Sequence, residues 1–272
     1  MNDLIRIIKS RKSIRTFDGN ILNYEHLKAL EEYMKDIPNP VDIPVEFVML
    51  DAKEHGLSSP VLSGERLYVT GKVEKKPYAD VAFGYSFEKL VLYAWSLGIG
   101  TVWIGGTMKR ELFEKAVGLK SGEMMPCISP LGYPAEKKSL KETMMRKGVG
   151  ADSRISQAKL FFEEEWGQAL NPDDVMSEVL DMVRWAPSAI NKQPWRIVHR
   201  DGAYHFYEKK DRGYSSDATG DMQKIDVGIA LCHFIMGLEY KGRKAEVKIQ
   251  DPGIKIPADA EYIVSVMDVK TE

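Results

Sequence analysis

The chain has little cysteine and lacks the signature motifs of several large enzyme classes. Its 272 residues contain two cysteines, Cys127 and Cys232, which form no CxxC pair. A disulfide framework is therefore excluded, and a reducing compartment is expected. The Walker A, HExxH and GxSxG motifs are all missing. The five histidines do not cluster at metal-ligand spacing. P-loop enzymes, HExxH metalloproteases and α/β-hydrolases are set aside, and we predict no metal site.

Strong charge and long apolar runs are also missing. The net charge is −2 and the pI is about 6.3, which gives no electrostatic reason to expect nucleic acid or an acidic membrane as a partner. The longest apolar run, residues 90–97, is far too short to cross a membrane. The first residues, MNDLIRIIKSRK, hold too short an apolar stretch for a signal peptide. We therefore expect a cytoplasmic protein.

What the chain does contain is an internal repeat. Residues 85–98 resemble residues 229–242, with a glycine before and a glycine closing each run at the same offset (228 − 84 = 144). Residues 21–50 lie without gaps on residues 171–200, at an offset of 150 (194 − 44 = 150). Two similar units in tandem can reproduce within one chain a site that normally lies between two subunits.

The hydrophobic pattern predicts a mixed α+β order that occurs twice. Charged residues 134–165 lack a strong period and are interpreted as the connector between the halves. The second copy of the first amphipathic helix is expected to have Asn171 as its cap and Pro172 at its first position. Helices are expected at 3–9, 24–37, 85–97, 109–117, from 172 onward, and at 227–238. Strands are expected at 45–50, 66–70, 101–104, 127–131, 195–199, 204–207, 245–249 and 262–267.

The segment RKSIR near the N-terminus places three cations and a hydroxyl within five positions. In an extended loop, alternate side chains point the same way, so Arg11, Ser13 and Arg15 can converge on one anion. The planar arginine fork suits phosphate. A solvated basic loop has the same composition, but the apolar residues Ile14 and Phe17 favour a loop that is packed against the fold.

The segment APSAINKQPW, residues 186–195, follows an expected helix and is small, polar and bounded by prolines. Its backbone amides and the side chains of Ser188, Asn191 and Gln193 can bind the polar edge of a planar ligand. A helix-terminating loop that leads into a core strand explains the same residues equally well. The matching positions of the first copy, residues 37–42, lack this set of side chains, which favours a function for the second copy.

The segment GIGTVWIGG, residues 98–106, contains a GxG but no dinucleotide fingerprint. The third glycine position is Trp103, and the segment follows a helix and enters a strand, the reverse of the required order. Gly105 and Gly106 carry no side chain, which allows the close approach of a flat ring. A tight helix-to-strand turn accounts for Gly98.

Together these segments resemble the flavin-dependent nitroreductase family. The resemblance rests on RKSIRTF, APSAINKQPW and GYSFEKLVLYAWSLGIGTVWIGG followed by PLGYPAEK. In the usual family order the Pro-Ser motif soon follows the basic loop, whereas here it lies in the second half. That departure resembles a single-chain, internally duplicated branch. It implies a nitroreductase-like α+β fold in which residues 1–150 and 151–272 pack as a pseudo-two-fold dimer with central helices and mixed or antiparallel sheets.

Members of this family are typically homodimers that bind FMN between subunits. The resemblance assigns Arg11, Lys12 and Ser13 to the phosphate and the ribityl chain, and Arg15 to the N1/O2 edge of the flavin. It further implies a loop over the ring, backbone near N5 and a lysine, Lys137 or Lys138, on the phosphate. The loop over the ring comprises Pro187, Ser188, Ala189 and Asn191. The backbone near N5 belongs to Ile104, Gly105 and Gly106.

The function implied is an FMN-dependent oxidoreductase that uses NAD(P)H to reduce nitroaromatics, quinones or similar electron-poor acceptors in two steps. The flavin carries the chemistry, so no catalytic side chain is expected. Two alternatives stay open: an FMN-binding or sensing protein without turnover, and another flavin chemistry on the same fold, such as reductive dehalogenation or flavin destruction. Because the halves bury the usual dimer surface, we expect a monomer with one FMN in a single site between them.

Overall fold

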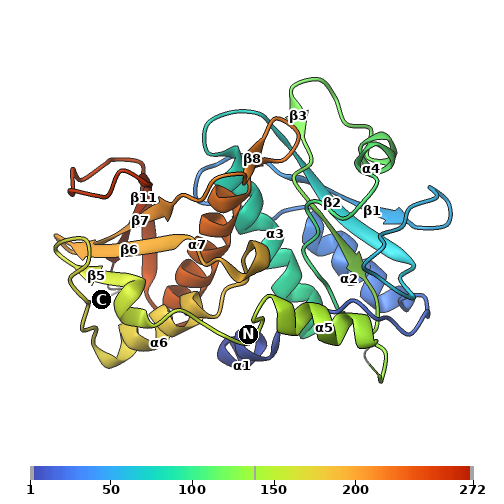
Figure 1. Ribbon diagram of the computed structural model, residues 1–272, viewed down its shortest axis with the longest axis horizontal. Coiled ribbons are helices and arrows are strands. Elements are labelled where there is room, and N and C mark those ends of the chain that lie inside the picture. The colour runs from blue at the N-terminus through green and yellow to red at the C-terminus, as the bar shows by residue number, and fades with distance from the viewer. Residues whose placement is uncertain (1–2, 138, 270–272) are drawn as a thin grey trace.

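The computed structural model describes residues 3–137 and 139–269, and it confirms the expected α+β architecture. Two long helices, α3 (Ala79–Ser96) and α7 (Met222–Tyr240), run through the centre of the molecule and pack on each other. One sheet lies on each side of this helix pair (Figure 1). Both helices begin several residues earlier than the apolar pattern predicts, α3 at Ala79 and α7 at Met222.

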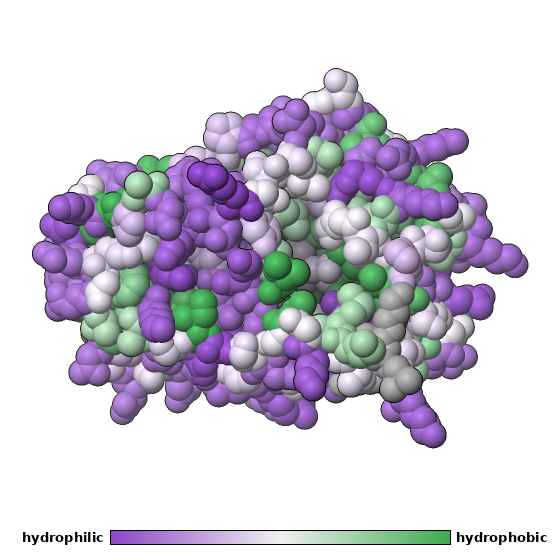
Figure 2. All heavy atoms as spheres, in the orientation of Figure 1, coloured by the Kyte–Doolittle hydropathy of each residue, from purple (hydrophilic) through white to green (hydrophobic). Residues whose placement is uncertain are grey.

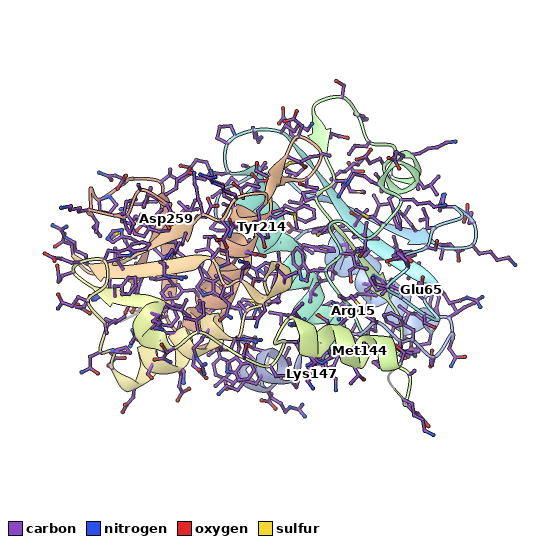
Figure 3. The ribbon with its side chains drawn as sticks, viewed as in Figure 1. Arg15, Glu65, Met144, Lys147, Tyr214 and Asp259 are labelled. Carbon is purple, nitrogen blue, oxygen red and sulfur yellow. The ribbon has the colours of Figure 1, made fainter. Side chains whose placement is uncertain are left out.

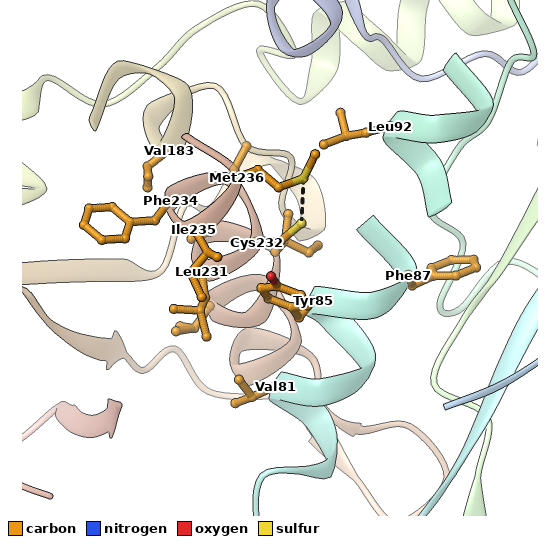
Figure 4. Packing of buried hydrophobic residues seen from close by; sticks show 14 of the residues in the cluster. Val81, Tyr85, Phe87, Leu92, Val183, Leu231, Cys232, Phe234, Ile235 and Met236 are labelled. Atoms are coloured by element: carbon orange, nitrogen blue, oxygen red, sulfur yellow. Dashed lines mark hydrogen bonds between the residues drawn. The ribbon is translucent and has the colours of Figure 1, made fainter. Parts of the chain in front are cut away.

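Both central helices are buried around almost their whole circumference, since each has a sheet on one side and the other helix beside it. Figure 4 shows Tyr85 on α3 close to Cys232 on α7. The Cys232 thiol donates to Met236 Sδ at 3.6 Å within α7, so this cysteine is a core residue as expected. The centre of the protein is therefore a buried helix–helix contact.

The two helices cross where each has a glycine. A Cβ atom on Gly84 would lie 2.1 Å from the carbonyl oxygen of Ile225, and a Cβ atom on Gly228 would lie 2.3 Å from that of Val81. Only glycine allows two backbones to come this close. The two contacts are reciprocal under the 144-residue offset of the repeat, as contacts across a two-fold axis are.

The first sheet is built around β2, which pairs antiparallel with three other strands. Its strands are β1 (Glu46–Asp51), β2 (Leu67–Glu74), β3 (Glu123–Met124) and β4 (Ile128–Leu131). The second sheet has the order β10–β11–β7–β6–β5, antiparallel except for the β5–β6 pair. Its strands are β5 (Phe161–Glu163), β6 (Trp195–Arg200), β7 (Ala203–Lys209), β10 (Lys244–Lys248) and β11 (Ala260–Val269).

Shorter elements surround this centre. The helices are α1 (Leu4–Ser10), α2 (Tyr24–Met34), α4 (Arg110–Ala116), α5 (Leu140–Gly148) and α6 (Asp174–Arg184). A small hairpin joins β8 (Ser215–Ser216) to β9 (Gly220–Asp221), and single 3-10 turns occupy Gln157–Lys159 and Ala189–Asn191. No helix in the described ranges is both long and apolar enough to cross a membrane.

The repeat in sequence is matched by a repeat of elements. The succession α2–β1–β2–α3–β4 recurs as α6–β6–β7–α7–β11. The middle strand of each set pairs with the strand before it and with the last strand, so β2 contacts β1 and β4 as β7 contacts β6 and β11. The helices Tyr24–Met34 and Asp174–Arg184 lie at corresponding positions, each capped by the polar residue before it.

Four sequence-based expectations are wrong in detail. Residues 101–104 form isolated bridges and no strand, because their partners lie on different segments. The first amphipathic helix ends at Met34, so Ile37 lies beyond it. Asp173 caps α6, which leaves Pro172 before the helix. The connector contains the helix α5, which a short stretch without a clear apolar stripe does not reveal.

Candidate functional site

A cavity of about 580 Å³ gathers segments that are far apart in the sequence. Figure 2 shows this face of the molecule hollowed near its centre, with hydrophobic side chains at the edge of the hollow. Figure 3 shows Arg15 next to α5 and Tyr214 at the start of the β8–β9 hairpin. The cavity is lined by residues 9–13 and 15, 102–103, 105–107, 127, 145–146, 149, 151–152, 154, 185, 187–191, 214, 219, 222, 225–226 and 229.

The basic loop is packed down, as its apolar residues predict. Ile14 and Phe17 are buried, and they fit because Gly100 and Gly132 leave room for them: a Cβ atom on either glycine would come within 2.9 Å of these side chains. The amide of Ile14 donates to the carbonyl of Thr101 at 2.9 Å. With these apolar residues fixed in the core, the cationic side chains of the loop face the cavity.

Helix α5 closes the other side of the basic loop. Ser139 caps the helix by accepting from the amide of Glu142 at 3.1 Å. The Glu142 carboxylate in turn accepts from the amide of Arg15 at 3.2 Å and from the hydroxyl of Thr16 at 2.9 Å. These bonds dock α5 onto the loop, and the helix then contributes Arg146 to the cavity.

Four arginines meet in this cavity: Arg11, Arg15, Arg146 and Arg154. Burial lowers the pKa of Arg11 and of Arg15, and in both cases Arg146 adds to the effect. Burial lowers the pKa of Arg154 to about 10, and the nearby charges of Arg11 and Arg146 contribute. The cavity therefore gathers four guanidinium groups, which are the cations that best match carboxylates and phosphates.

Three of these guanidinium groups have buried nitrogens with no partner. Arg11 Nη1, Arg15 Nε and Arg154 Nε make no hydrogen bond within the described part of the chain. Buried N–H groups normally have acceptors, and leaving them unpaired is costly, more so for charged groups. The arrangement therefore has the donors of an anion site, and phosphate, with several acceptor oxygens, matches it.

The loop of residues 187–193 forms the opposite wall and is held by its own side chains. The amide of Gln193 donates to Ser188 Oγ at 2.9 Å, and Asn191 Nδ2 donates to the carbonyl of Gly150 at 2.8 Å. In this structure the side chains of Asn191 and Gln193 bond within the protein, while Asn191 also lines the cavity. They pre-organise the loop, while the Ser188 hydroxyl proton makes no hydrogen bond within the described chain.

The same loop has strained backbone. Ile190 has φ 42° and ψ 32°, and the neighbouring Asn191 and Gln193 also have positive φ. A β-branched residue in this left-handed region is unusual and unfavourable. Such strain persists where surrounding contacts impose it, and it is concentrated at functional sites.

Gly105 and Gly106 line the cavity, whereas Ile104 does not. Both backbone polar groups of Ile104 are bonded to Ile128 at 2.9 Å, so they are not available to a ligand. Arg110, which the sequence did not single out, holds this turn by donating to the carbonyl of Gly105 at 2.7 Å. Beside the turn, Trp103 donates from Nε1 to the buried Glu88 carboxylate at 3.0 Å.

The structure brings together most of the residues selected from sequence. Arg11, Lys12, Ser13, Arg15, Gly105, Gly106, Pro187, Ser188, Ala189 and Asn191 all line one cavity. Ile104 lies beside it in the core, and Lys138 lies outside the described residues. Sequence reasoning missed Arg146, Arg154, Trp185, Tyr214 and Asp226, which also line the cavity.

Two of the missed residues had a signal in the sequence. Ser139-x-x-Glu142 is a capping-box pattern, which marks the start of a helix in the connector and so places Arg146 on it. Asp226 is an acidic residue at the edge of an apolar helical run, and buried acids are rare outside functional sites. Tyr214 and Trp185 had no such signal, because only the fold brings them near the loops.

Comparisons with known proteins agree with this fold. A family model described as "Putative TM nitroreductase" matches residues 3–238. A solved structure from Thermotoga maritima MSB8, described as a "putative nitroreductase", is similar with a TM-score of 0.63 and 20% identity, over 98% of this chain and 94% of that one. At this identity the likeness shows the fold alone.

Shorter structures match about half of the chain. A nitroreductase with bound FMN from Bacteroides fragilis NCTC 9343 has a TM-score of 0.42 and 22% identity, over 52% of this chain and 92% of that one. An FMN-dependent nitroreductase from Clostridium difficile R20291 has a TM-score of 0.42 and 21% identity, over 50% and 90%. None of the curated proteins matches the chain.

Proposed function

The chain belongs to the nitroreductase family that matches residues 3–238, and from that membership we propose that it is an FMN-dependent oxidoreductase. In this proposal NAD(P)H is the reductant, and an electron-poor acceptor such as a nitroaromatic or a quinone is reduced. The observation that carries the proposal is the group of arginines with unpaired buried N–H groups beside the loop of residues 187–193. The two nitroreductases described with FMN are consistent with it.

The residues of the cavity fit FMN by their chemistry. Arg11 and Arg15 have buried N–H groups that find no acceptor among the described residues. The phosphate would supply an acceptor for Arg11, and the N1/O2 edge of the ring one for Arg15. Lys12 and Ser13 stand beside these arginines as further donors. Gly106 provides bare backbone on which a planar ring can lie, since an added Cβ atom there meets nothing within 4 Å. At Gly105 an added Cβ atom would lie 2.8 Å from Met222 Cε, so this glycine makes room for that side chain. When bound, the flavin supplies hydride and electron transfer, and the protein supplies binding, orientation and electrostatics.

We further propose that the chain acts as two fused halves, residues 1–150 and 151–272, with one flavin site between them. The basic loop comes from the first half and the loop of residues 187–191 from the second. The reciprocal glycine contacts of α3 and α7 support a pseudo-two-fold relation. Because this contact already buries the surface that a second subunit would cover, the proposal includes a monomer with one FMN per chain.

The test is FMN titration of the Arg11→Ala/Arg15→Ala double variant. Each charge-assisted hydrogen bond is worth about 1.5–3 kcal/mol. The loss of two therefore weakens FMN binding by about 100-fold or more. The matched control, Lys53→Ala/Lys244→Ala, removes two exposed cations that do not line the cavity, and its affinity is expected to match the wild type. Equal affinity of the arginine variant and its control overturns the assignment, provided that circular dichroism shows both to be folded.

A further inference from the structure

Asp226 is a buried acid in the wall of the cavity. It lies near the start of α7, its side chain is 3% exposed, and it shares the cavity with Gly105, Met222 and the loop of residues 187–191. No part of the anion site described above needs a negative charge here. A buried carboxyl group in a ligand cavity is costly to keep, and such groups gather at functional sites.

The surroundings of Asp226 favour its neutral form. Both carboxyl oxygens lie about 3 Å from one donor, the amide of Ala189, and this hydrogen bond by itself lowers the pKa. Burial raises the pKa of Asp226 well above its usual range, and the charges of Asp221 and Glu208 act in the same direction. The Cys127 thiol also lines the cavity and lies close enough for Asp226 to affect it, and burial raises the pKa of this thiol. No lysine or arginine of the described chain forms an ion pair with Asp226.

A neutral carboxyl group has one O–H donor. The amide of Ala189 satisfies one acceptor position, and no hydrogen bond within the described chain takes up the Asp226 proton. The proton is therefore free to point to a ligand in the cavity. Helix formation and packing do not require a carboxyl group at this position. The matching residue of α3, 144 positions earlier, is Ala82.

We propose that Asp226 is the proton donor of the site, giving its carboxyl proton to the heteroatom of the acceptor that is being reduced. This rests on the proposed function. For a quinone, two electrons and one proton arrive as hydride from reduced flavin. The hydride would form an O–H bond at one quinone oxygen. The Asp226 O–H bond breaks, and its proton forms the O–H bond at the other oxygen, so that the product is the hydroquinone. The carboxylate then regains a proton from water.

The experiment compares two acceptors in the FMN-loaded Asp226→Asn variant. Benzoquinone takes electrons with protons, whereas ferricyanide takes electrons alone. Asparagine keeps the size and an acceptor for the Ala189 amide but has no acidic proton. The ratio of the quinone rate to the ferricyanide rate is expected to fall about 100-fold or more, the usual contribution of a general acid. In the wild type the same ratio declines as the pH rises and Asp226 ionises.

The control is Glu239→Gln, which removes an exposed acid from the other end of α7 and does not line the cavity. Its ratio is expected to equal that of the wild type. If Asp226→Asn does not fold, Asp226→Ser serves instead, since its hydroxyl is too weak an acid to replace the carboxyl group. An unchanged ratio in either folded Asp226 variant overturns the proposal.

A second readout is independent of turnover. In flavin-free protein labelled with carbon-13 aspartate, one carboxyl signal is expected to remain protonated at neutral pH and to be missing from Asp226→Asn. Its absence from the wild type overturns the proposal. Failure of the proposed function has a different signature: wild-type protein that binds no FMN, or whose bound flavin is not bleached by NADH or NADPH without oxygen.

Discussion

The central helices α3 and α7 pack alike but carry different chemistry. At the crossing, Gly84 meets the carbonyl of Ile225 and Gly228 meets that of Val81, so each helix makes the same backbone contact with the other. Two residues before the crossing glycine, α3 has Ala82 and α7 has the cavity acid Asp226. The close contact is retained in both copies because changing it in either one causes a clash. The side chains around it are free to diverge.

The divergence continues along the same elements. Position 89 on α3 is a partly exposed lysine, whereas the matching His233 on α7 is fully buried. The registers of β1–β2 and β6–β7 place Val73 and Glu208 at equivalent positions, both buried. At these matched positions the buried titratable groups, His233, Glu208 and Asp226, belong to the second copy. Asp226 and Glu208 lie close enough for their charges to interact. The second copy thus contributes the cavity acid Asp226, whereas the equivalent residue of the first copy, Ala82, lies in the core.

The largest expected effect comes from removing His233. Its ring bonds the carbonyl of Met182 and the carboxyl group of Glu88, each at 3.0 Å, with both side chains fully buried. His233→Ala leaves Glu88 without this partner, and breaking a buried pair costs about 4 kcal/mol. Urea unfolding measures the loss. The control at the matching position of α3 is Lys89→Ala, expected to change stability by less than about 0.5 kcal/mol. Similar losses of unfolding free energy in both variants contradict the difference between the matched positions 89 and 233.

The glycine crossing tests the symmetric part of the comparison. Gly84→Val and Gly228→Val each place side-chain atoms on a backbone carbonyl, and each is expected to lower the free energy of unfolding by about 3 kcal/mol. The control is Gly148→Ala at the end of α5, where an added Cβ atom meets nothing within 4 Å. Chemical unfolding of the three variants shows whether the two crossing positions are equivalent. If one valine is tolerated and the other is not, the crossing is not reciprocal.

Part of this architecture can be predicted from the sequence alone. The glycine spacing and the offset of the repeat predict the two central helices, and the structure confirms them. The loops at residues 11–15 and 186–194 were expected to meet, and both line the cavity. Such features are predictable because they depend on local pattern or on a repeat that relates distant segments.

Other parts of the site depend on contacts that only the folded chain makes. Helix α5 reaches the cavity through the bonds of Glu142 to the basic loop, residues that are 126 and 127 positions apart. The side chain of Asn191 looks like a ligand contact in sequence, but in the fold it holds the connector. Polar residue types indicate that hydrogen bonds will form, and tertiary packing decides with which partner.

The pH dependence of stability distinguishes the two sheets. Burial raises the pKa of Glu208 from 4.5 to about 7, so below about pH 4.5 the group is protonated in both states and costs nothing. As the pH rises to 7 and above, the unfolded chain ionises first, and the folded state loses stability relative to it. Glu208→Gln removes this loss but keeps a buried polar group, so we expect a gain of about 2 kcal/mol near pH 8.

The measurement is urea unfolding of the wild type and of Glu208→Gln at about pH 4 and pH 8. The gain is expected at the higher pH and is absent at the lower one. At the equivalent position of the first sheet, Val73→Ala lowers stability by a similar amount at both pH values, because no charge is involved. A gain in Glu208→Gln that does not change with pH contradicts the buried ionisation.

The smallest effect concerns the strained turn. Ile190 is 61% exposed, with φ 42°. Its conformation costs about 1–2 kcal/mol for a residue with a Cβ branch. Asparagine tolerates the left-handed region, so Ile190→Asn is expected to stabilise the chain by about 1 kcal/mol. At the matching position of the first copy, Pro40 has its φ set near −65° by its ring. Pro40→Asn has no such strain to relieve and is expected to give no gain. Thermal unfolding of the two variants compares them directly. A gain at position 190 alone locates the strain in the loop that lines the cavity, whereas equal changes at both positions would mean that the two loops are held in the same way.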